Sequence, residues 1–468
     1  MGNSLLLDLY ELTMAESYSV YKKNTFATFD LFVRELPVNR AYLVACGLED
    51  ILAYIRELRF TRDDINYLKK QRLFSTDFLK YLTHFRFRGD IWAMPEGTVF
   101  FTNEPMIRVT ASILEAQIIE SFLLNTINLQ TMIAAKASRV VCAGRGKGLY
   151  DFSLRRTHGS EAGIKVARAA YIAGFNGTSC VLAGKLYGIP VVGTMAHAFV
   201  MSFKHELDSF LAYSETFPGR TTLLVDTYDI KKGIKNAITA GLYLKEKGRR
   251  LQGVRLDSGD IVSLSKLARR MLDKAGLDYV KIFASGNLDE FKIRDLLQRG
   301  ARVDNFGVGT HMGTSIDAPS LDIIYKISEV TDEDGRFLPT MKLSKAKVTY
   351  PGRKQVFRVQ DKYGRFVKDV LGLEKEKINP ALSTKGGGSS LGKGGVKGRP
   401  LLIKVVDKGK VIYQSPSLDK IRLFTRSNLA RFTAALKEVY SRYKYPVIVS
   451  PRLKKLRRSL ASQLEKRQ

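Results

Sequence analysis

The chain has 468 residues, enough for about two to four domains with sizeable cores. Hydrophobic residues make up 45% of it and charged residues 26%, a balance that excludes a largely disordered chain. No apolar run reaches the roughly 18 residues of a membrane span, and the N-terminus lacks a signal-peptide pattern. Three widely spaced cysteines without a CxxC motif argue against a disulfide framework and a structural zinc site. We therefore expect a cytoplasmic protein with no membrane partner.

The net charge is +30, from 76 Lys and Arg against 46 Asp and Glu. Such an excess suits a nucleic acid, an anionic membrane surface or a phosphorylated substrate, and charge alone does not choose among them. The basic segment 452–467 has no interleaved aromatic residues, and the chain carries no RNP or zinc pattern. Nucleic-acid binding is therefore the disfavoured alternative.

The first predicted domain, residues 1–136, is an N-terminal α/β domain. Apolar residues at helical spacing predict helices, and the alternation in ATFDLFVRE predicts a strand. A long apolar-faced helix is expected to lead into the strand that opens the next domain. The expected elements are helices over 5–18, over 42–58 and from 113, and strands over 27–35 and 139–144.

The second predicted domain, residues 137–320, shows a regular alternation of strands and helices. Alternation with short connections predicts a parallel sheet or an α/β barrel. Polar and glycine residues follow the strands directly, which is where ligands bind in such folds. The expected strands are 139–144, 188–194, 221–229, 251–257, 279–286 and 303–310, and the expected helices are 160–173, 231–247, 261–275 and 288–299.

The third predicted part, residues 321–468, has strands with glycine turns over 323–370 and an amphipathic helix near 426–441. Between them lies the glycine-rich segment 384–400, which we interpret as a flexible loop. Its Gly387-x4-Gly392-Lys393 pattern is close to a phosphate-binding P-loop. Glycine at 394 replaces the Ser or Thr that would hold magnesium, so a true P-loop is disfavoured.

Two strand-end clusters contain groups suited to anions or to acid–base chemistry. Arg155 and Arg156 in FSLRRTHG could bind a phosphate or a carboxylate, or form a solvated basic turn. His197 in GTMAHAF could be a nucleophile or an acid–base group, or a satisfied core histidine. The sequence leaves these alternatives open.

The later strand ends carry carboxylates and glycines. In GVRLDSGD, Arg255 and Asp257 suit ribose hydroxyls or magnesium, although Asp and Ser are also ordinary helix caps. The next two strand ends have glycines whose backbone N–H groups could face an anion, Gly286 with Asn287 in SGNLDE and Gly309 with Thr310 in FGVGTHMGTS. No GxGxxG opens a strand–helix unit, which disfavours a nicotinamide dehydrogenase.

These clusters resemble, in their order, the nicotinate phosphoribosyltransferase family. The resemblance runs over nearly the whole chain through DLYELTMAESY, FSLRRTHGSEAG, NGTSCVLAGKLYGIPVVGTMAHAFV, GVRLDSGD, SGNLD and GVGT. It implies an α/β fold in which an irregular, type II phosphoribosyltransferase-like barrel stands beside an α/β sandwich domain formed by the N- and C-terminal parts. It also implies that nicotinate and phosphoribosyl pyrophosphate give nicotinate mononucleotide and pyrophosphate in NAD salvage, with ATP hydrolysis coupled through a phosphohistidine.

The resemblance also implies roles for individual residues and for cofactors. His197 matches the phosphorylated histidine, and Tyr10 and Phe152 match aromatics that sandwich the pyridine ring, Tyr10 from the partner subunit of a homodimer. Magnesium is expected to bind through pyrophosphate, with ATP as a co-substrate and no metal ligand assigned to the protein. The other matches fall into three sets. Arg155, Thr194 and Arg255 match groups near the nicotinate and the ribosyl donor, and Asp257 matches a carboxylate on the ribose or pyrophosphate side. The remaining matches are substrate-binding residues, of which the two glycines and the threonine match the 5′-phosphate site: Gly286, Asn287, Gly309 and Thr310.

The identity of the pyridine substrate depends on Ser179. Related nicotinamide enzymes have an Asp at this position that binds the amide nitrogen, and a carboxylate there would repel nicotinate. Ser179 therefore favours the acid over the amide. Nicotinamide and quinolinate phosphoribosyltransferases remain the alternatives, and GTMAHAF speaks against the quinolinate enzyme.

Overall fold

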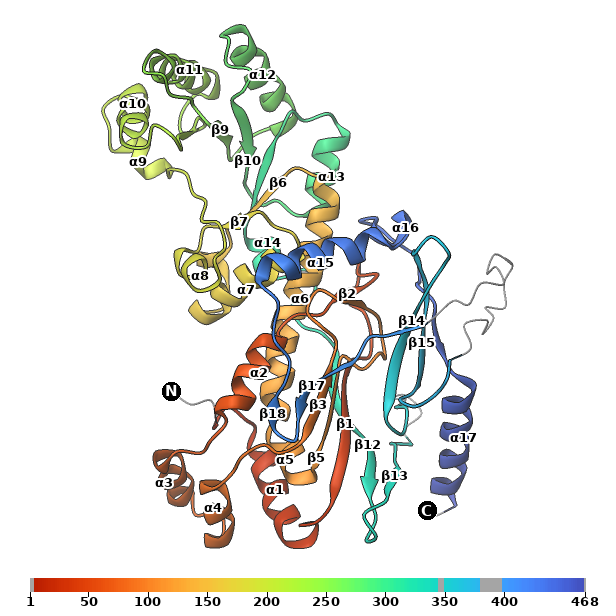
Figure 1. Cartoon of the computed structure of the whole chain (residues 1–468). Coiled ribbons are helices and arrows are strands. Elements are labelled where there is room, and N and C mark those ends of the chain that lie inside the picture. The colour runs from red at the N-terminus through yellow and green to blue at the C-terminus, as the bar shows by residue number, and fades with distance from the viewer. Residues whose placement is uncertain (1–3, 344–348, 379–397, 467–468) are drawn as a thin grey trace. The chain divides into compact units, whose positions relative to one another are not determined.

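The structure is a computed structural model that describes residues 4–343, 349–378 and 398–466. The chain divides into two compact units (Figure 1). The sheet unit comprises Met1–Met132, Ser320–Lys437 and Ser441–Gln468, and the barrel unit comprises Ile133–Pro319 and Glu438–Tyr440. The P-loop-like pattern lies outside the described residues. Within the described ranges, none of the helices combines the length and the hydrophobicity needed to cross a bilayer.

The sheet unit contains two large sheets and a small one, and in the larger of them strands from the C-terminal part pair with N-terminal strands. The larger sheet is antiparallel and has, in spatial order, β13 (Phe337–Pro339), β12 (Ile323–Thr331), β1 (Phe26–Val33), β5 (Ile107–Ser112), β3 (Asp90–Ala93), β17 (Ile403–Asp407) and β18 (Lys410–Val411). The second sheet has β16 (Arg399–Pro400), β14 (Lys354–Gln360), β15 (Phe366–Leu373) and β19 (Val447–Val449), and β2 (Leu43–Val44) pairs with β4 (Val99–Phe100).

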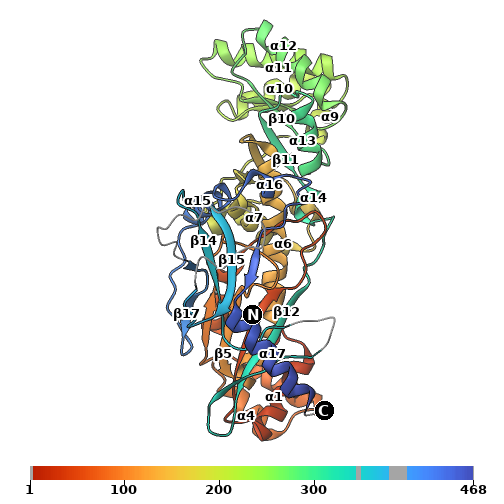
Figure 2. The ribbon, with the colours of Figure 1, turned by 90° about the vertical axis from the view of Figure 1, so that its right-hand side faces the viewer.

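Helices cover these sheets, and their ends follow local capping rules. Thr61 and Asp64 form a capping box at the start of one helix, α3, and Ser450 caps another, α17, at Pro451. Both ribbon views place α17 beside β15 (Figures 1 and 2). The helices are α1 (Leu9–Tyr21), α2 (Leu48–Glu57), α3 (Arg62–Gln71), α4 (Thr76–Thr83), α5 (Ile113–Ile118), α15 (Leu418–Ala430), α16 (Ala434–Lys437) and α17 (Pro451–Glu465).

Several helix predictions in this unit were wrong in extent. The helix expected over 5–18 is α1, which begins four residues later, and the helix expected from 113 is interrupted where α5 ends. The segment 42–58 is not one helix, because Gly47 has a φ of 107° and separates β2 from α2. The helix expected near 426–441 is instead the end of α15 and the short α16. The sequence analysis also missed α17, whose many basic residues obscure the leucines that it turns toward the unit, of which Leu453 is fully buried.

The barrel unit is an irregular α/β barrel built on six parallel strands, which confirms the predicted α/β class. Their order is β7 (Gly177–Thr178), β6 (Gly148–Asp151), β11 (Asn305–Val308), β10 (Lys281–Ala284), β9 (Gly253–Leu256) and β8 (Thr222–Leu224). The helices between them are α7 (Ser160–Ala173), α8 (Val181–Tyr187), α9 (His197–Met201), α10 (Glu206–Thr216), α11 (Ile230–Glu246), α12 (Ile261–Lys274), α13 (Glu290–Gln298) and α14 (Thr310–Gly313), with a 3₁₀ turn, η1, at Leu154–Arg156. The α6 helix (Glu120–Gly144) begins in the sheet unit and ends in the barrel unit.

Two expected strands of the barrel were wrong, and two real ones were missed. Residues 139–144 belong to α6, since a short apolar run fits a buried helix as well as a strand. Residues 188–194 form only an isolated bridge, between Val191 and Thr178. The first strand is β6, which follows the GRGKG turn, and β7 has only two residues and no apolar pattern to reveal it.

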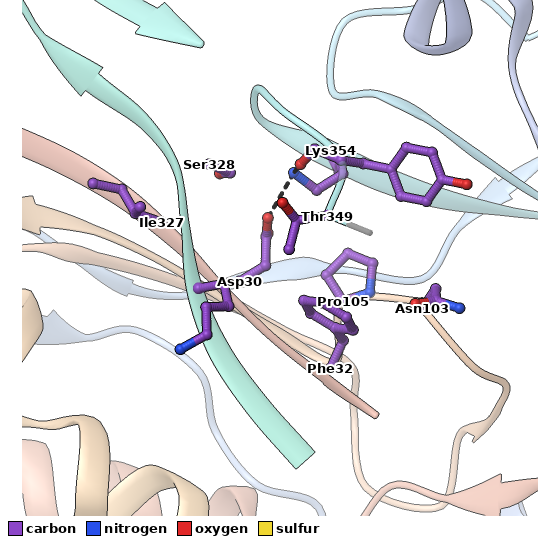
Figure 3. Close-up of a pocket in the computed structure, with 10 residues that line it drawn as sticks. Asp30, Phe32, Asn103, Pro105, Ile327, Ser328, Thr349 and Lys354 are labelled. Carbon is purple, nitrogen blue, oxygen red and sulfur yellow. Dashed lines mark hydrogen bonds and ion pairs between the residues drawn. The ribbon is translucent and has the colours of Figure 1, made fainter. Parts of the chain in front are cut away.

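A buried ion pair lies in a small pocket of the sheet unit, between β1 and β14 (Figure 3). The Lys354 Nζ lies 2.7 Å from Asp30 Oδ2 and also donates to the Gly352 carbonyl at 2.7 Å. The second oxygen of Asp30 and the Thr349 hydroxyl line the same pocket, are buried and have no hydrogen-bond partner within the described residues. The cavity, about 10 Å³, is large enough for one water molecule that could serve both groups.

A second buried cluster, formed by Glu104, Arg358 and Asp369, should make the stability of the protein depend on pH. Burial, together with the nearby Asp369 carboxylate, raises the pKa of Glu104 well above 4.5, against the opposing charge of Arg358. The folded protein therefore keeps a proton that the unfolded chain releases, and the free energy of unfolding should fall as pH rises from about 5 by up to about 1.4 kcal/mol per pH unit.

Glu104→Gln should flatten this dependence of stability on pH and stabilise the protein at about pH 8. Urea unfolding across this pH range, with the exposed Glu57→Gln as control, measures it; a slope unchanged by Glu104→Gln would contradict it.

Candidate active site

The turns at the carboxyl ends of the barrel strands enclose two hollows, of about 510 and 310 Å³. Parallel strands end at one edge of a sheet, so the polar turns of distant segments meet there. Phe152, Arg155, Arg255 and Asp257 line both hollows, which are therefore adjoining. The first is also lined by Ser179, Gly193, Thr194, Met195, Ala196, His197 and Leu224, and the second by Arg156, Ser285, Gly286, Asn287, Gly307, Gly309 and Thr310.

The structure thus brings together all the candidate site residues except Tyr10. Tyr10 lies on α1 in the sheet unit, with nearly half of its surface exposed. Burial and the charge of Glu120 raise the pKa of its phenol, and its side chain is hydrogen-bonded to the same glutamate. Its role in binding the pyridine ring stays a prediction.

Arg255 and Asp257 form the centre of a hydrogen-bond network between the two hollows. The Arg255 guanidinium donates to Thr194 Oγ1 at 2.9 Å, to Ser285 Oγ at 2.8 Å and to Asp257 Oδ1 at 2.7 Å. Burial pushes the pKa of Asp257 up, but the Ser285 hydrogen bond and the Arg255 charge outweigh it and lower the pKa below its usual value. The network therefore presents a fixed cation beside a carboxylate that is ionised at neutral pH.

Asp226 supports the site from behind Asp257, and the sequence analysis missed it. It follows β8, and its Oδ2 accepts hydrogen bonds from the Asp257 N–H at 2.9 Å and the Ser258 hydroxyl at 2.6 Å. Its Oδ1 is buried and has no hydrogen-bond partner within the described part of the chain. The other site residues were found by searching for polar residues directly after each predicted strand. Asp226 escaped this search because the predicted strand ran to residue 229, whereas β8 ends at Leu224.

His197 is the first residue of α9, and its side chain is 41% exposed, so the alternative of a buried core histidine is wrong. Its Nδ1 lies 3.1 Å from the Thr227 hydroxyl, which anchors one side of the ring. Its Nε2 lies 4.0 Å from Asp257 Oδ2. The ring is thus held through one nitrogen, while the other lies near the shared carboxylate, an arrangement suited to a nucleophile or a proton carrier.

A buried carboxylate sets the geometry of the first hollow. Asp151, at the end of β6, accepts hydrogen bonds from the Ser153 N–H at 2.9 Å and the Thr178 hydroxyl at 2.8 Å. Its carbonyl oxygen also accepts from the Ser179 N–H at 2.8 Å. The turns that carry Phe152 and Ser179 are therefore tied to one residue. The Phe152 ring stacks on Phe283 with centroids 5.5 Å apart, which fixes its orientation.

The second hollow is formed by two glycine turns after β10 and β11. A side chain at Gly286 would come within 2.1 Å of the Asp257 carbonyl, and its φ of 96° suits only glycine. Asn287 follows with a φ of 47°. Gly309 and Thr310 open α14 on the adjacent strand end. Such turns direct backbone N–H groups outward, and Arg155 and Arg156 add positive charge, so this hollow suits a phosphate. No group of three or more His, Cys, Asp or Glu suited to a metal occurs in the part of the chain that the structure describes.

Comparisons with known proteins agree with the resemblance read from the motifs. Residues 5–128 match the N-terminal domain of nicotinate phosphoribosyltransferase, residues 148–370 match the nicotinate phosphoribosyltransferase family, and residues 353–457 match the C-terminal domain of the enzyme. The chain is 43% identical to a nicotinate phosphoribosyltransferase of Mycobacterium tuberculosis, over 96% of this chain and 92% of that protein, and 38% identical to that of Bacillus subtilis, over 96% and 93%. The crystal structure of human nicotinic acid phosphoribosyltransferase superposes with a TM-score of 0.83 at 28% identity, over 97% of this chain and 99% of that one. The crystal structure of the nicotinate-nucleotide pyrophosphorylase of Pyrococcus furiosus superposes with a TM-score of 0.71 at 26% identity, over 92% of this chain and 96% of that one. The chain belongs to the nicotinate phosphoribosyltransferase family.

Proposed function

We propose that the protein joins nicotinate to phosphoribosyl pyrophosphate, giving nicotinate mononucleotide and pyrophosphate, in cytoplasmic NAD salvage. The observation that carries this proposal is the pair of adjoining hollows that share Arg255 and Asp257. One has an aromatic ring and a hydroxyl suited to a pyridine acid. The other has glycine turns and arginines suited to a sugar phosphate. The shared pair lies where the two substrates would meet.

The reaction forms a bond between the pyridine nitrogen and ribose C1, while the bond from C1 to the pyrophosphate oxygen breaks. The leaving pyrophosphate takes the electron pair, and C1 passes through an oxocarbenium-like state. The protein mainly positions the two partners and stabilises the leaving charge. Phe152 would orient the pyridine ring, Arg155 would neutralise the phosphates, and Asp257 would hold the ribose side.

The proposed coupling to ATP runs through His197. With Nδ1 donating to the Thr227 hydroxyl, Nε2 carries a lone pair that can attack the γ-phosphorus of ATP. The new nitrogen–phosphorus bond forms as the bond to ADP breaks, and ADP leaves with the electron pair. Later hydrolysis of the phosphohistidine returns the neutral ring and inorganic phosphate, so the protein would be a ligase-class phosphoprotein.

Magnesium fits the same edge of the barrel. The ionised Asp257, which lines both hollows, is an oxygen ligand of the kind that Mg²⁺ prefers. Bound to pyrophosphate, the ion would supply charge neutralisation of the leaving group. A single carboxylate is too few ligands for Mg²⁺, so the remaining ligands would be pyrophosphate oxygens and water.

A homodimer is part of the proposal, because each unit exposes an apolar helix face. On α1 and the segment before it, Leu6, Leu9 and Tyr10 are exposed, and on α8 Val181 and Leu186 are exposed. Apolar patches of this kind mark protein–protein contacts. A two-fold dimer in which α1 of one subunit meets α8 of the other would bring Tyr10 toward the hollow that contains Ser179, two residues before α8.

A product assay tests the proposed function. Purified protein with phosphoribosyl pyrophosphate, Mg²⁺ and one of nicotinate, nicotinamide or quinolinate, each with and without ATP, should form a mononucleotide from nicotinate and release pyrophosphate. Release of carbon dioxide from quinolinate, or equal catalytic efficiency on nicotinamide, would replace the proposal with one of the two alternative enzymes.

Ser179 should determine the preference for the acid. Ser179→Asp would place a carboxylate beside that of nicotinate, so kcat/KM for nicotinate should fall relative to nicotinamide by about ten- to a hundred-fold, the loss expected for roughly 1.5–3 kcal/mol of charge-assisted hydrogen bonding. Ser179→Asn, of the same size but uncharged, is the matched control and should change the ratio much less. Equal ratios in the two variants would show that charge at this position does not select the substrate.

A further inference from the structure

A fully buried lysine joins the segments behind the two glycine turns of the second hollow. Lys136, on α6, lies 2.7 Å from Glu290 Oε2 and 2.9 Å from Asp317 Oδ1. Lys136 and Glu290 are 1% and 0% exposed, and Asp317 is 20% exposed. None of the three lines the hollow. They therefore cannot touch a ligand there and can act only through the turns.

The two carboxylates are attached to the turns by short stretches of chain. Glu290 is the third residue after Asn287 and opens α13, and Asp317 lies shortly after α14, which begins at Thr310. Arg139, one turn along α6 from Lys136, binds the other oxygen of Glu290 at 2.9 Å. Lys136 is thus one cation shared by the chain segments that follow both turns.

A second contact ties the same two segments on another side. His311 Nδ1 lies 3.0 Å from Asp289 Oδ2, and Asp289 caps α13 through its other oxygen. The turn after β10 and the turn after β11 are therefore joined at two points, by His311 with Asp289 and by Lys136 with its two carboxylates. Burying an ammonium group is costly unless its partners are held in place, whereas an apolar side chain would fill the space without that cost.

We propose that Lys136 is a positioning residue for phosphate binding: its bridge from Glu290 to Asp317 holds the two glycine turns at the spacing that a sugar phosphate requires. The inference rests on the proposed function, because it takes the second hollow as the site of the ribosyl 5-phosphate. Releasing one turn from the other would leave the ring-binding hollow and the Arg255–Asp257 network in place. The loss should therefore fall on the phosphorylated substrate and leave the pyridine substrate unaffected.

Lys136→Met tests this, because methionine fills a similar volume without charge and Glu290 keeps its ion pair with Arg139. We expect the KM for phosphoribosyl pyrophosphate and the Kd for ribose 5-phosphate to rise about ten-fold or more, as misplaced binding groups do. The KM for nicotinate and the kcat at saturating donor should stay close to those of the unmodified protein. Asp317→Asn removes one end of the bridge at a partly exposed position and should shift the same two constants, so it carries the test if Lys136→Met fails to fold.

Arg269→Met is the matched control within the barrel unit. Arg269 bonds the carbonyls of Val280 and Leu277 at 2.7 and 3.0 Å, beside the other end of β10, so its loss should lower stability without changing either constant. The inference would be overturned if Lys136→Met and Asp317→Asn bound ribose 5-phosphate as tightly as the unmodified protein does. It would also be overturned if Arg269→Met lost ribose 5-phosphate binding to the same extent as these two variants. Failure of the unmodified protein to form nicotinate mononucleotide from nicotinate and phosphoribosyl pyrophosphate would instead overturn the proposed function on which it rests.

Discussion

Replacing His197 with alanine should abolish the transfer of phosphate from γ-labelled ATP to the protein. In the unmodified protein the label should be stable in base and lost in acid, as a nitrogen–phosphorus bond requires. The ATP-dependent part of the rate should fall by about a hundred-fold or more, the range lost when a group that takes part in the chemistry is removed. Some transfer without ATP should remain, because the two hollows and the Arg255–Asp257 network do not depend on the imidazole.

Two further variants test whether the loss of phosphate transfer is specific to His197. His84→Ala removes an exposed histidine of the sheet unit and should leave both labelling and ATP stimulation unchanged. Thr227→Val removes the hydroxyl that anchors Nδ1 but keeps the ring, so labelling should slow without disappearing. Labelling that survives undiminished in His197→Ala would assign the phosphate to another residue and end the proposed coupling.

The sequence allowed prediction of three strand ends of the barrel, those of β9, β10 and β11, because each of these strands has an apolar pattern of its own. β9, β10 and β11 lie within segments predicted as strands, and the residues that follow them, from Asp257 to Thr310, do meet at one edge of the barrel. β7 has two residues and is a strand only because it pairs with β6, so no local pattern could reveal it. Such tertiary pairing overrides local preference and is invisible in a single segment.

The contacts that complete the site were beyond prediction for a related reason. Asp226 is held by the Asp257 backbone and Ser285 by Arg255. Lys136 is held by one carboxylate at the start of α13 and by another after α14. Each partner is about 30 to more than 150 positions away in the sequence, and a single chain offers no spacing rule for such pairs. The sequence could therefore identify residues that line the hollows, but not the residues that hold those lining residues in place.

The hypothesis that the two subunits share each site leads to a complementation experiment, in which activity either returns to about half or stays at the level of the single variants. If Tyr10 reaches the hollow of the partner subunit, a site consists of one subunit's His197 and the other subunit's Tyr10. Tyr10→Ala should then reduce nicotinate binding by about ten- to a hundred-fold, from the roughly 1–3 kcal/mol that stacking on an aromatic ring contributes. His197→Ala should lose the ATP-coupled reaction for the reason given above. Each homodimer would be defective at both of its sites.

A heterodimer of the two variants distributes these defects unequally. The subunit with Tyr10→Ala keeps its own His197 and receives an intact Tyr10 from its partner, so one site is whole, while the other site carries both substitutions. Co-expression with two different affinity tags and purification through both isolates this species. Its ATP-coupled activity should be about half that of the unmodified dimer, since a two-fold dimer has two equivalent sites. If Tyr10 instead served its own subunit, each site of the heterodimer would carry one defect, and activity would stay at the level of the single variants.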